Sequence, residues 1–209
     1  AGANERHDWD YLTKLAPKDG SVQLQKITTQ MGVLVLAGPK SREVLQKLTD
    51  TDLSNDKFKW LTGKPINVGY AQAEALRVNF VGELGWELHH PIEMQNYIFD
   101  ELMKAGAEFD IKPFGIRAMD SMRLEKSYRL IPREMSIEYA ALESGLDRFV
   151  KLDKECDFVG KTALLDWQKR GFVNSFVTLE VHDVEDADAR GSEGLYKDGE
   201  LVGRATSGG

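Results

Sequence analysis

Residues 77–87 read Arg-Val-Asn-Phe-Val-Gly-Glu-Leu-Gly-Trp-Glu, and this stretch says more about the fold than any other. Alternate positions up to residue 80 are apolar, and alternation predicts a half-buried β-strand, here over residues 73–80. Two glycines then bracket a carboxylate, and glycine permits a sharp bend or a close approach of backbones. The sequence therefore predicts a strand that ends at a tight corner.

The corner carries carboxylates beside aromatic rings. Glu83 stands between the glycines, Phe80 precedes it, and Glu87 follows Trp86. An aromatic ring can cover the face of a flat heterocycle, while a carboxylate accepts hydrogen bonds from its ring N–H groups. A β-hairpin with a solvated acidic tip explains the same residues, because such turn chemistry is common. The stretch alone leaves both interpretations open.

Composition narrows the class of protein. The chain has 209 residues, of which 42% are hydrophobic and 29% charged, as in ordinary globular proteins. Its net charge of −7 disfavours a nucleic-acid partner, since phosphate binding needs clustered Lys and Arg. No apolar run has membrane-spanning length, and no His, Cys and carboxylate spacing predicts a metal site. The single Cys156 fits a reducing compartment, so we expect the cytoplasm, or the mitochondrial matrix in a eukaryote.

The expected elements mix helices and strands and finish in β structure, which indicates an α+β fold. Helices are expected over residues 4–15, 39–48, 92–105, 113–126 and 159–169. Strands are expected over residues 22–29, 32–36 (buried, because it is continuously apolar), 73–80, 86–89, 175–181, 195–197 and 201–205. Asp198-Gly199 predicts a hairpin. Residues 127–142 show no pattern, and long irregular segments are often functional.

Two clusters of charged or titratable residues have simple structural interpretations. The basic stripe Arg117, Arg123, Arg129 and Arg133, with Glu125 and Glu134 interleaved, is typical of a solvated face with weak ion pairs. His89 and His90 are adjacent on an expected strand, so they point to opposite faces of a solvated strand end.

Five segments, in order along the chain, resemble the motifs of one family. They are residues 32–45 ("ALQGPxS"), 77–87 ("YxGExGyE"), 120–126 ("DSLRLE"), 142–147 with 157–161 ("PLEAGL" and "DFIGKxAL"), and 203–208 ("GxxTSG"). This is the pattern of the folate-binding aminomethyltransferases, which include the T-protein of glycine cleavage and the C-terminal region of dimethylglycine and sarcosine dehydrogenases. The resemblance covers nearly the whole chain.

Details of the resemblance favour one subgroup. Residues 125–129, Glu-Lys-Ser-Tyr-Arg, are similar to the "EKGYR" of the dehydrogenases rather than the "EAG" of T-proteins. The resemblance thus implies a larger parent flavoprotein with an FAD domain that this chain lacks. We expect a fragment: an N-terminally truncated folate-binding aminomethyltransferase domain over residues 1–171, then the beginning of a small C-terminal β-barrel domain over residues 172–209.

The family's catalytic carboxylate aligns with Asp8. It lies in Arg-His-Asp-Trp at residues 6–9, which resembles the family pattern "xxxxHDxxW". A carboxylate there can orient an attacking amine, stabilise positive charge and accept a proton. The structural alternative is an acid at a helix start, favoured by the helix dipole. Asp10 is the second candidate.

The resemblance also implies a set of cofactor-binding residues. Glu87 aligns with the family's pterin-binding Glu, and Phe80 replaces its usual Tyr. Glu83 and Tyr128 complete the candidates. Met119 stands where T-proteins carry a folate-contacting Arg, a departure that the dehydrogenase-type members share and that puts T-protein activity itself in doubt.

The implied activity is tetrahydrofolate-dependent transfer of a one-carbon unit from an amine-derived iminium. The implied partners are folate, the amine-derived substrate, and an FAD domain or a lipoyl carrier; the fragment by itself is expected to be inactive. Two alternatives stay open. One is a folate-dependent demethylase acting on another methyl donor, and the other is a non-catalytic folate-binding or scaffold module.

Overall fold

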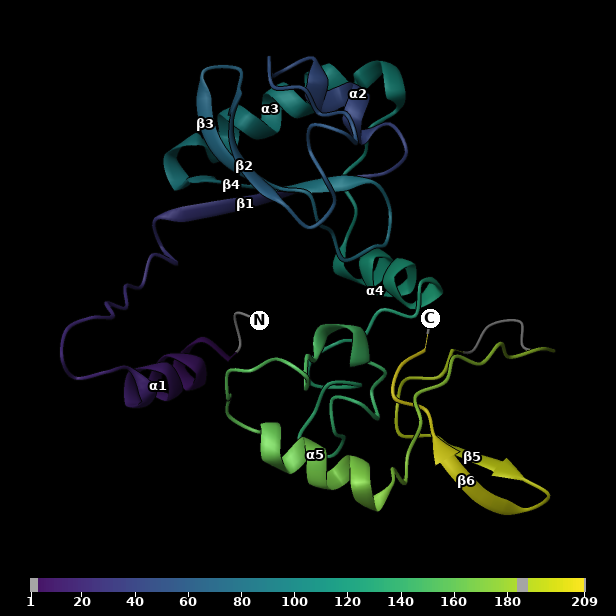
Figure 1. Ribbon diagram of the computed structural model, residues 1–209. Helices are drawn as coiled ribbons and strands as arrows, with labels where there is room; N and C mark the ends of the chain where they lie inside the picture. Colours follow the sequence, from purple (N-terminus) through teal and green to yellow (C-terminus); the bar gives the residue numbers. More distant parts are fainter. Residues whose placement is uncertain (1–3, 184–187, 209) are drawn as a thin grey trace. The chain divides into compact units, whose positions relative to one another are not determined.

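The computed structural model describes residues 4–183 and 188–208, and the chain divides into two compact units, residues 1–115 and residues 116–209 (Figure 1). Each unit has its own secondary structure. The boundary between them follows Gly115. The domain boundary expected after residue 171 lies inside the second unit and stays a prediction.

The first unit contains a four-stranded antiparallel sheet with the order β1-β4-β3-β2 (Figure 1). Its elements are α1 (Glu5–Leu15), β1 (Met31–Ala37), α2 (Ser41–Gln46), β2 (Gly63–Val68), β3 (Ala71–Leu76), β4 (Gly85–Pro91), the 3₁₀ helix η2 (Ile92–Met94), α3 (Gln95–Gly106) and η3 (Ala107–Phe109). The helices predicted over residues 4–15, 39–48 and 92–105 are confirmed, as is the strand predicted at residues 86–89, which pairs with β3 in antiparallel orientation.

One face of the sheet packs against α2 and α3. Along β4, the buried residues Trp86, Leu88 and His90 alternate with the half-buried Glu87 and His89, as the two-residue period of a strand requires. The core on the packed face comprises Leu36, Val44, Leu45, Leu53, Phe58, Ile66, Val68, Ala71, Ala73, Ala75, Trp86, Leu88, Ile98 and Leu102. The other face of β4 is the more open one, and we call it the open face.

The strand predictions at residues 22–29 and 32–36 differ from the structure. Residues 22–29 form no strand, since alternation alone does not supply a partner with which to pair. β1 does form, but it is not buried on both sides: Val33 and Val35 are each 45% exposed. The reason is that β1 lies at the edge of the sheet and only one of its faces meets the core.

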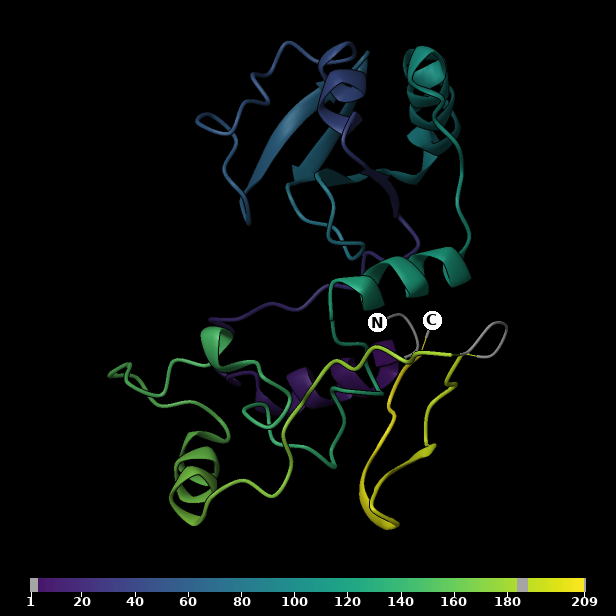
Figure 2. The same cartoon turned by 90° about the vertical axis from the view of Figure 1, so that its right-hand side faces the viewer.

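The second unit contains α4 (Ile116–Glu125), η4 (Asp147–Phe149), α5 (Lys161–Arg170), β5 (Gly194–Lys197) and β6 (Glu200–Arg204). Figure 2 shows β5 and β6 as a hairpin. Asp198 and Gly199 form its turn with φ of +53° and +84°, the two positive values that a type I′ turn needs. The predicted hairpin, both helices and the irregular stretch 127–142 are confirmed.

The predicted strand over residues 175–181 is wrong, because those residues are irregular. The sequence also indicates an acidic loop over residues 183–190, and this stretch lies partly outside the described residues. The only sheet that the described residues of this unit form is the two-stranded β5–β6 hairpin. The start of a β-barrel is therefore not confirmed, whereas the mixture of helices and strands agrees with the expected class.

Candidate functional site

The corner at residues 77–84 is closed by a side chain. The amide Nδ2 of Asn79 donates a hydrogen bond to the carbonyl of Glu83, and its Oδ1 accepts one from the N–H of Val81 at 3.0 Å. Asparagine side chains compete in this way with the ladder of a sheet. For that reason β3 ends before the corner, and the predicted extension of the strand to residue 80 is wrong.

The glycines of the corner serve the bend and the close approach that the sequence predicts. Gly82 has a φ of +73°, which side-chain-bearing residues rarely adopt. A Cβ on Gly85 would lie 2.4 Å from the carbonyl oxygen of Leu36. The carbonyl of Leu84 accepts hydrogen bonds from the N–H of Gly38 at 2.8 Å and the hydroxyl of Ser41 at 2.9 Å. The corner is thereby fixed against the turn between β1 and α2.

Glu87 follows the corner and lies on the open face of the sheet. Its cross-strand neighbours are Val35 on β1 and Leu76 on β3. The Oε2 atom of Glu87 lies 3.2 Å from Nε2 of His89, and no other described residue donates a hydrogen bond to this carboxylate. Glu87 is thus a half-buried acceptor with free capacity on a partly apolar surface.

Phe80 and Glu83 lie in the corner itself. Phe80 is half-buried and Glu83 is exposed. Both residues are within seven positions of Glu87 in the sequence, since β4 begins directly after the corner. Their binding roles stay predictions.

Asp8 lies in the first turn of α1, where the helix is confirmed. Asn4 occupies the N-cap position without a side-chain cap bond, and Asp8 is within the helix instead of capping it. Its Oδ1 is 3.2 Å from Nδ1 of His7, and both side chains are exposed. No residue of α1 is buried. Among the described residues, His7 is the one that contacts the carboxylate of Asp8 within hydrogen-bonding distance, and the catalytic role of Asp8 stays a prediction.

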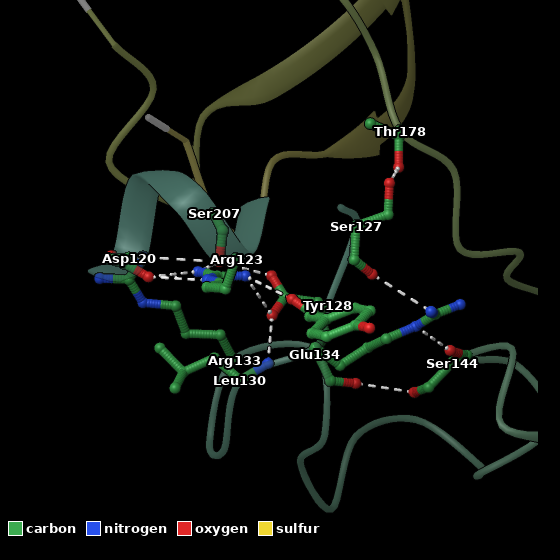
Figure 3. Close-up of polar contacts among 11 residues, drawn as sticks. Asp120, Arg123, Ser127, Tyr128, Leu130, Arg133, Glu134, Ser144, Thr178 and Ser207 are labelled. Carbon is green, nitrogen blue, oxygen red and sulfur yellow. Dashed lines mark hydrogen bonds and ion pairs between the residues drawn. The ribbon is translucent and has the colours of Figure 1, made fainter. Parts of the chain in front are cut away.

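The second unit contains a buried ionic network (Figure 3). Arg123 and Glu134 are 1% and 3% exposed, and Nη1 of Arg123 lies 3.3 Å from Oε2 of Glu134. Arg123 also donates to Asp120 and to the hydroxyl of Ser207, each at 2.7 Å. That hydroxyl donates in turn to Oε1 of Glu134 at 2.6 Å. Residues from α4, the irregular segment and the chain's last described stretch meet here.

The network fixes the backbone around Tyr128. Nη1 of Arg123 donates to the carbonyl of Tyr128 at 2.9 Å, and the N–H of Tyr128 donates to the carbonyl of Arg123 at the same distance. The N–H of Leu130 donates to Glu134 at 2.9 Å. The Tyr128 side chain is 37% exposed. Tyr128 belongs to a different unit from Glu87, and its cofactor-binding role stays a prediction.

Two residues that the sequence predicts to be solvated, Arg123 and His90, are buried. Arg123 is not part of a solvated face, because Glu134 and Ser207 enclose it from segments distant in the sequence. His90 is fully buried, with ring nitrogens 2.8 Å from the carbonyl of Leu88 and from Oε1 of Gln95. The opposite orientation of the two adjacent histidines is confirmed. The signal that could have singled out Arg123 was its place inside the motif at residues 120–126.

The pKa of Glu134 lies below its ordinary value of 4.5. Burial acts to raise it, but hydrogen bonds from Ser207, Thr206 and the N–H of Leu130, with the charge of Arg123, outweigh that effect. A depressed pKa in the folded state means that ionised Glu134 stabilises the fold above pH 4.5 and loses this contribution as the pH falls further.

We therefore expect the free energy of unfolding to fall as the pH drops below about 4.5, where the ionised form is lost. Glu134→Gln should flatten the dependence of the unfolding free energy on pH only in part. The reason is that the pKa of Glu143 is also lowered, chiefly by the N–H of Ala140, so that Glu143 contributes a dependence of the same sign. Urea unfolding followed by circular dichroism at a series of pH values from about pH 7 down to about pH 3 measures this dependence. Identical pH profiles for the two proteins would contradict the assignment.

A mixed α and β fold with a glycine-bracketed acidic corner is what the aminomethyltransferase resemblance predicts. The chain belongs to the GCVT N-terminal domain family, whose model matches residues 1–154.

Three relatives illustrate the family. The chain is 42% identical over 206 residues to "Dimethylglycine dehydrogenase, mitochondrial" of Homo sapiens. The aligned region covers 98% of this chain and 24% of that protein. The chain is 37% identical over 164 residues to "Aminomethyltransferase" of Thermoanaerobacter sp. (strain X514), covering 78% and 44%. It is 32% identical over 205 residues to "Pyruvate dehydrogenase phosphatase regulatory subunit, mitochondrial" of Mus musculus, covering 96% and 23%.

These relatives confirm the predicted family, and two of them are enzymes by name. The chain spans about a quarter of the length of the dehydrogenase it matches. Within the described residues, no helix is both long and apolar enough to cross a bilayer. Those same residues contain no group of three or more His, Cys, Asp or Glu that could hold a metal ion.

Proposed function

We propose that this chain is the folate-binding part of an enzyme that transfers a one-carbon unit from an amine-derived iminium to tetrahydrofolate. The observation that carries the proposal is Glu87, a half-buried carboxylate with a single described partner on the open face of the sheet. It follows a corner whose motif resembles the family's pterin-binding motif.

The residues on the open face fit a pterin ring. A flat heterocycle with N–H donors needs a carboxylate acceptor and an apolar surface. Glu87 offers the acceptor, and Val33 and Val35 of β1 are exposed beside it. Phe80 adds a ring at the corner, with Glu83 as a second carboxylate there. Tetrahydrofolate supplies the nitrogen atoms that take up the one-carbon unit.

Asp8 is the proposed acid–base group. Its carboxylate would orient the nitrogen that is to react, balance the positive charge of an iminium and accept the released proton. An exposed carboxylate can perform these tasks only when the remainder of the pocket surrounds it, so the proposal concerns the full-length parent protein. The name of the relative "Dimethylglycine dehydrogenase, mitochondrial" supports a parent that oxidises an amine in the mitochondria of a eukaryote. The FAD domain of that parent is proposed from the family resemblance.

We expect Glu87 and Asp8 to affect different steps. In the full-length parent, Glu87→Gln should weaken tetrahydrofolate binding roughly 10- to 100-fold, because a hydrogen bond to a charged group contributes about 1.5–3 kcal/mol. Asp8→Ala should leave that affinity nearly unchanged and lower folate-coupled turnover by about 10²–10⁴-fold, the range for general acid–base catalysis. Calorimetric titration and a coupled turnover assay measure the two effects.

Glu74→Gln is the matched control for the binding experiment. Glu74 pairs with His89 across β3 and β4 and is exposed on the same face as Glu87. It should retain full affinity. Equal affinities for Glu87→Gln and the unaltered protein would overturn the pterin site, and unchanged turnover in Asp8→Ala would overturn the catalytic role.

A non-catalytic folate-binding or scaffold module is the second candidate function. The relative named as a regulatory subunit favours it, since a protein that is 32% identical to this chain over 205 residues carries a name that refers to regulation. Saturable tetrahydrofolate binding by the full-length protein without one-carbon transfer from any amine donor would favour the module. Transfer from a methyl donor other than an oxidised amine would favour a demethylase. A lipoyl carrier protein is a proposed partner only if the one-carbon donor is bound to a lipoyl group.

A further inference from the structure

Two arginines in the first unit share one neutral acceptor. Arg42 comes from α2 and Arg77 follows the end of β3. Their Nη2 atoms donate to the same amide oxygen, Oδ1 of Asn55, at 2.7 Å and 2.6 Å. The two guanidinium groups therefore lie within two hydrogen-bond lengths of each other. Asn55 is exposed and contributes no charge.

Both guanidinium groups are held in place from other directions. Nε of Arg42 donates to the carbonyl of Leu53 at 2.9 Å, and Nη1 of Arg77 donates to the carbonyl of Phe58. The two groups lie 5.9 Å and 6.0 Å from the ring centre of the fully buried Trp86, within the range of a cation–π interaction. The arrangement is fixed before any ligand arrives, and such preorganisation favours binding.

Within the described part of the chain, the positive charge of the pair is not neutralised by a direct ion pair, although hydrogen bonds and, after them, the charge of Arg42 lower the pKa of the exposed Glu43. Among the residues that the structure describes, no carboxylate forms an ion pair with Arg42 or Arg77. Asp52, from the same loop as Asn55, instead accepts from the N–H of Ser54 at 2.8 Å. Each guanidinium carries five N–H donors, and the protein uses two of each. Burial and the charge of Arg42 both lower the pKa of Arg77, as expected for like charges in proximity.

We propose that Arg42 and Arg77, joined by Asn55, form a binding site for a small oxyanion, the carboxylate or phosphate group of a ligand. The free N–H donors of two fixed guanidinium groups match the oxygen atoms of such a group, which arginine binds in a bidentate manner. A bound anion also removes the repulsion between the two cations. The site does not depend on the pterin site, because none of its contacts involves Glu87.

Calorimetric titration of the full-length protein tests the site. Inorganic phosphate and, separately, glutarate are added at constant ionic strength maintained with chloride. We expect saturable binding of at least one probe, and Arg42→Gln should weaken it tenfold or more. Binding of phosphate alone would identify a phosphate ligand, and binding of glutarate alone a carboxylate ligand. No saturable binding of either probe beyond that of chloride would overturn the proposal.

Asn55→Asp separates a binding site from a merely structural pair. The new carboxylate would place a negative charge between the two guanidinium groups, so it should abolish binding of the probe while raising the melting temperature in low salt. Asn67→Asp makes the same change of charge at an exposed position near the far end of β2 and should bind the probe as the unaltered protein does. Undiminished binding by Asn55→Asp would contradict the proposed site.

Discussion

Replacing Arg123 with alanine is expected to destabilise the second unit by about 3–5 kcal/mol, the usual effect of breaking a buried ion pair. The substitution leaves Glu134, which is 3% exposed, without its countercharge. Ser207 and the N–H of Leu130 still donate to that carboxylate, but neither carries a positive charge. Since many domains are stable by only about 5–15 kcal/mol, this is a large share of the total. Urea unfolding followed by circular dichroism measures it.

Arg117→Ala is the matched control for this experiment. Arg117 is exposed on the same helix, α4, and a surface substitution of this kind usually changes stability by about 0.5 kcal/mol or less. The double variant Arg123→Met, Glu134→Leu should recover most of the loss, because two apolar side chains leave no buried charge behind. A loss in Arg123→Ala no greater than in Arg117→Ala would show that the network does not stabilise the unit.

The contrast between these arginines shows what local sequence can predict. Period and capping residues lie within a few positions of one another, so the helices at residues 92–105 and 159–169 and the turn at Asp198-Gly199 could be predicted. The burial of Arg123 could not. Its partner Ser207 is 84 positions away in the sequence. The spacing of residues within α4 does not indicate which charged residue of the helix a distant segment buries.

The same limit explains the errors in strands. Residues 22–29 and 175–181 contain residue types that favour strands, but a strand exists only where another strand pairs with it. At residues 77–84, alternation continues past the end of β3, and the side chain of Asn79 ends the strand instead. The placement of Glu87 on a strand followed from the sequence, whereas its contact with His89 depends on the strand that actually formed.

Trp86→Ala is the second substitution with a large expected effect, a loss of about 3–5 kcal/mol in the first unit, as for other large aromatic residues removed from a core. Trp86 is fully buried in the centre of the sheet's packed face. Its ring meets the edge of Phe58 at 6.2 Å between centroids and lies beneath the two guanidinium groups of Arg42 and Arg77. Thermal and urea unfolding measure the loss.

Trp86→Phe tests whether Trp86 stabilises the first unit through the packing of its ring or through its indole N–H group. The indole Nε1 is buried and has no hydrogen-bond partner among the described residues, so removing this N–H group breaks no bond and relieves an unsatisfied donor. Phenylalanine retains a ring in the core, and we expect it to restore most of the stability that alanine loses. Val33→Ala, at a 45% exposed position of β1, should cost much less than Trp86→Ala. If Phe proved as destabilising as Ala at position 86, the indole nitrogen would have to make a bond that the folded core requires, and packing alone would not explain this residue.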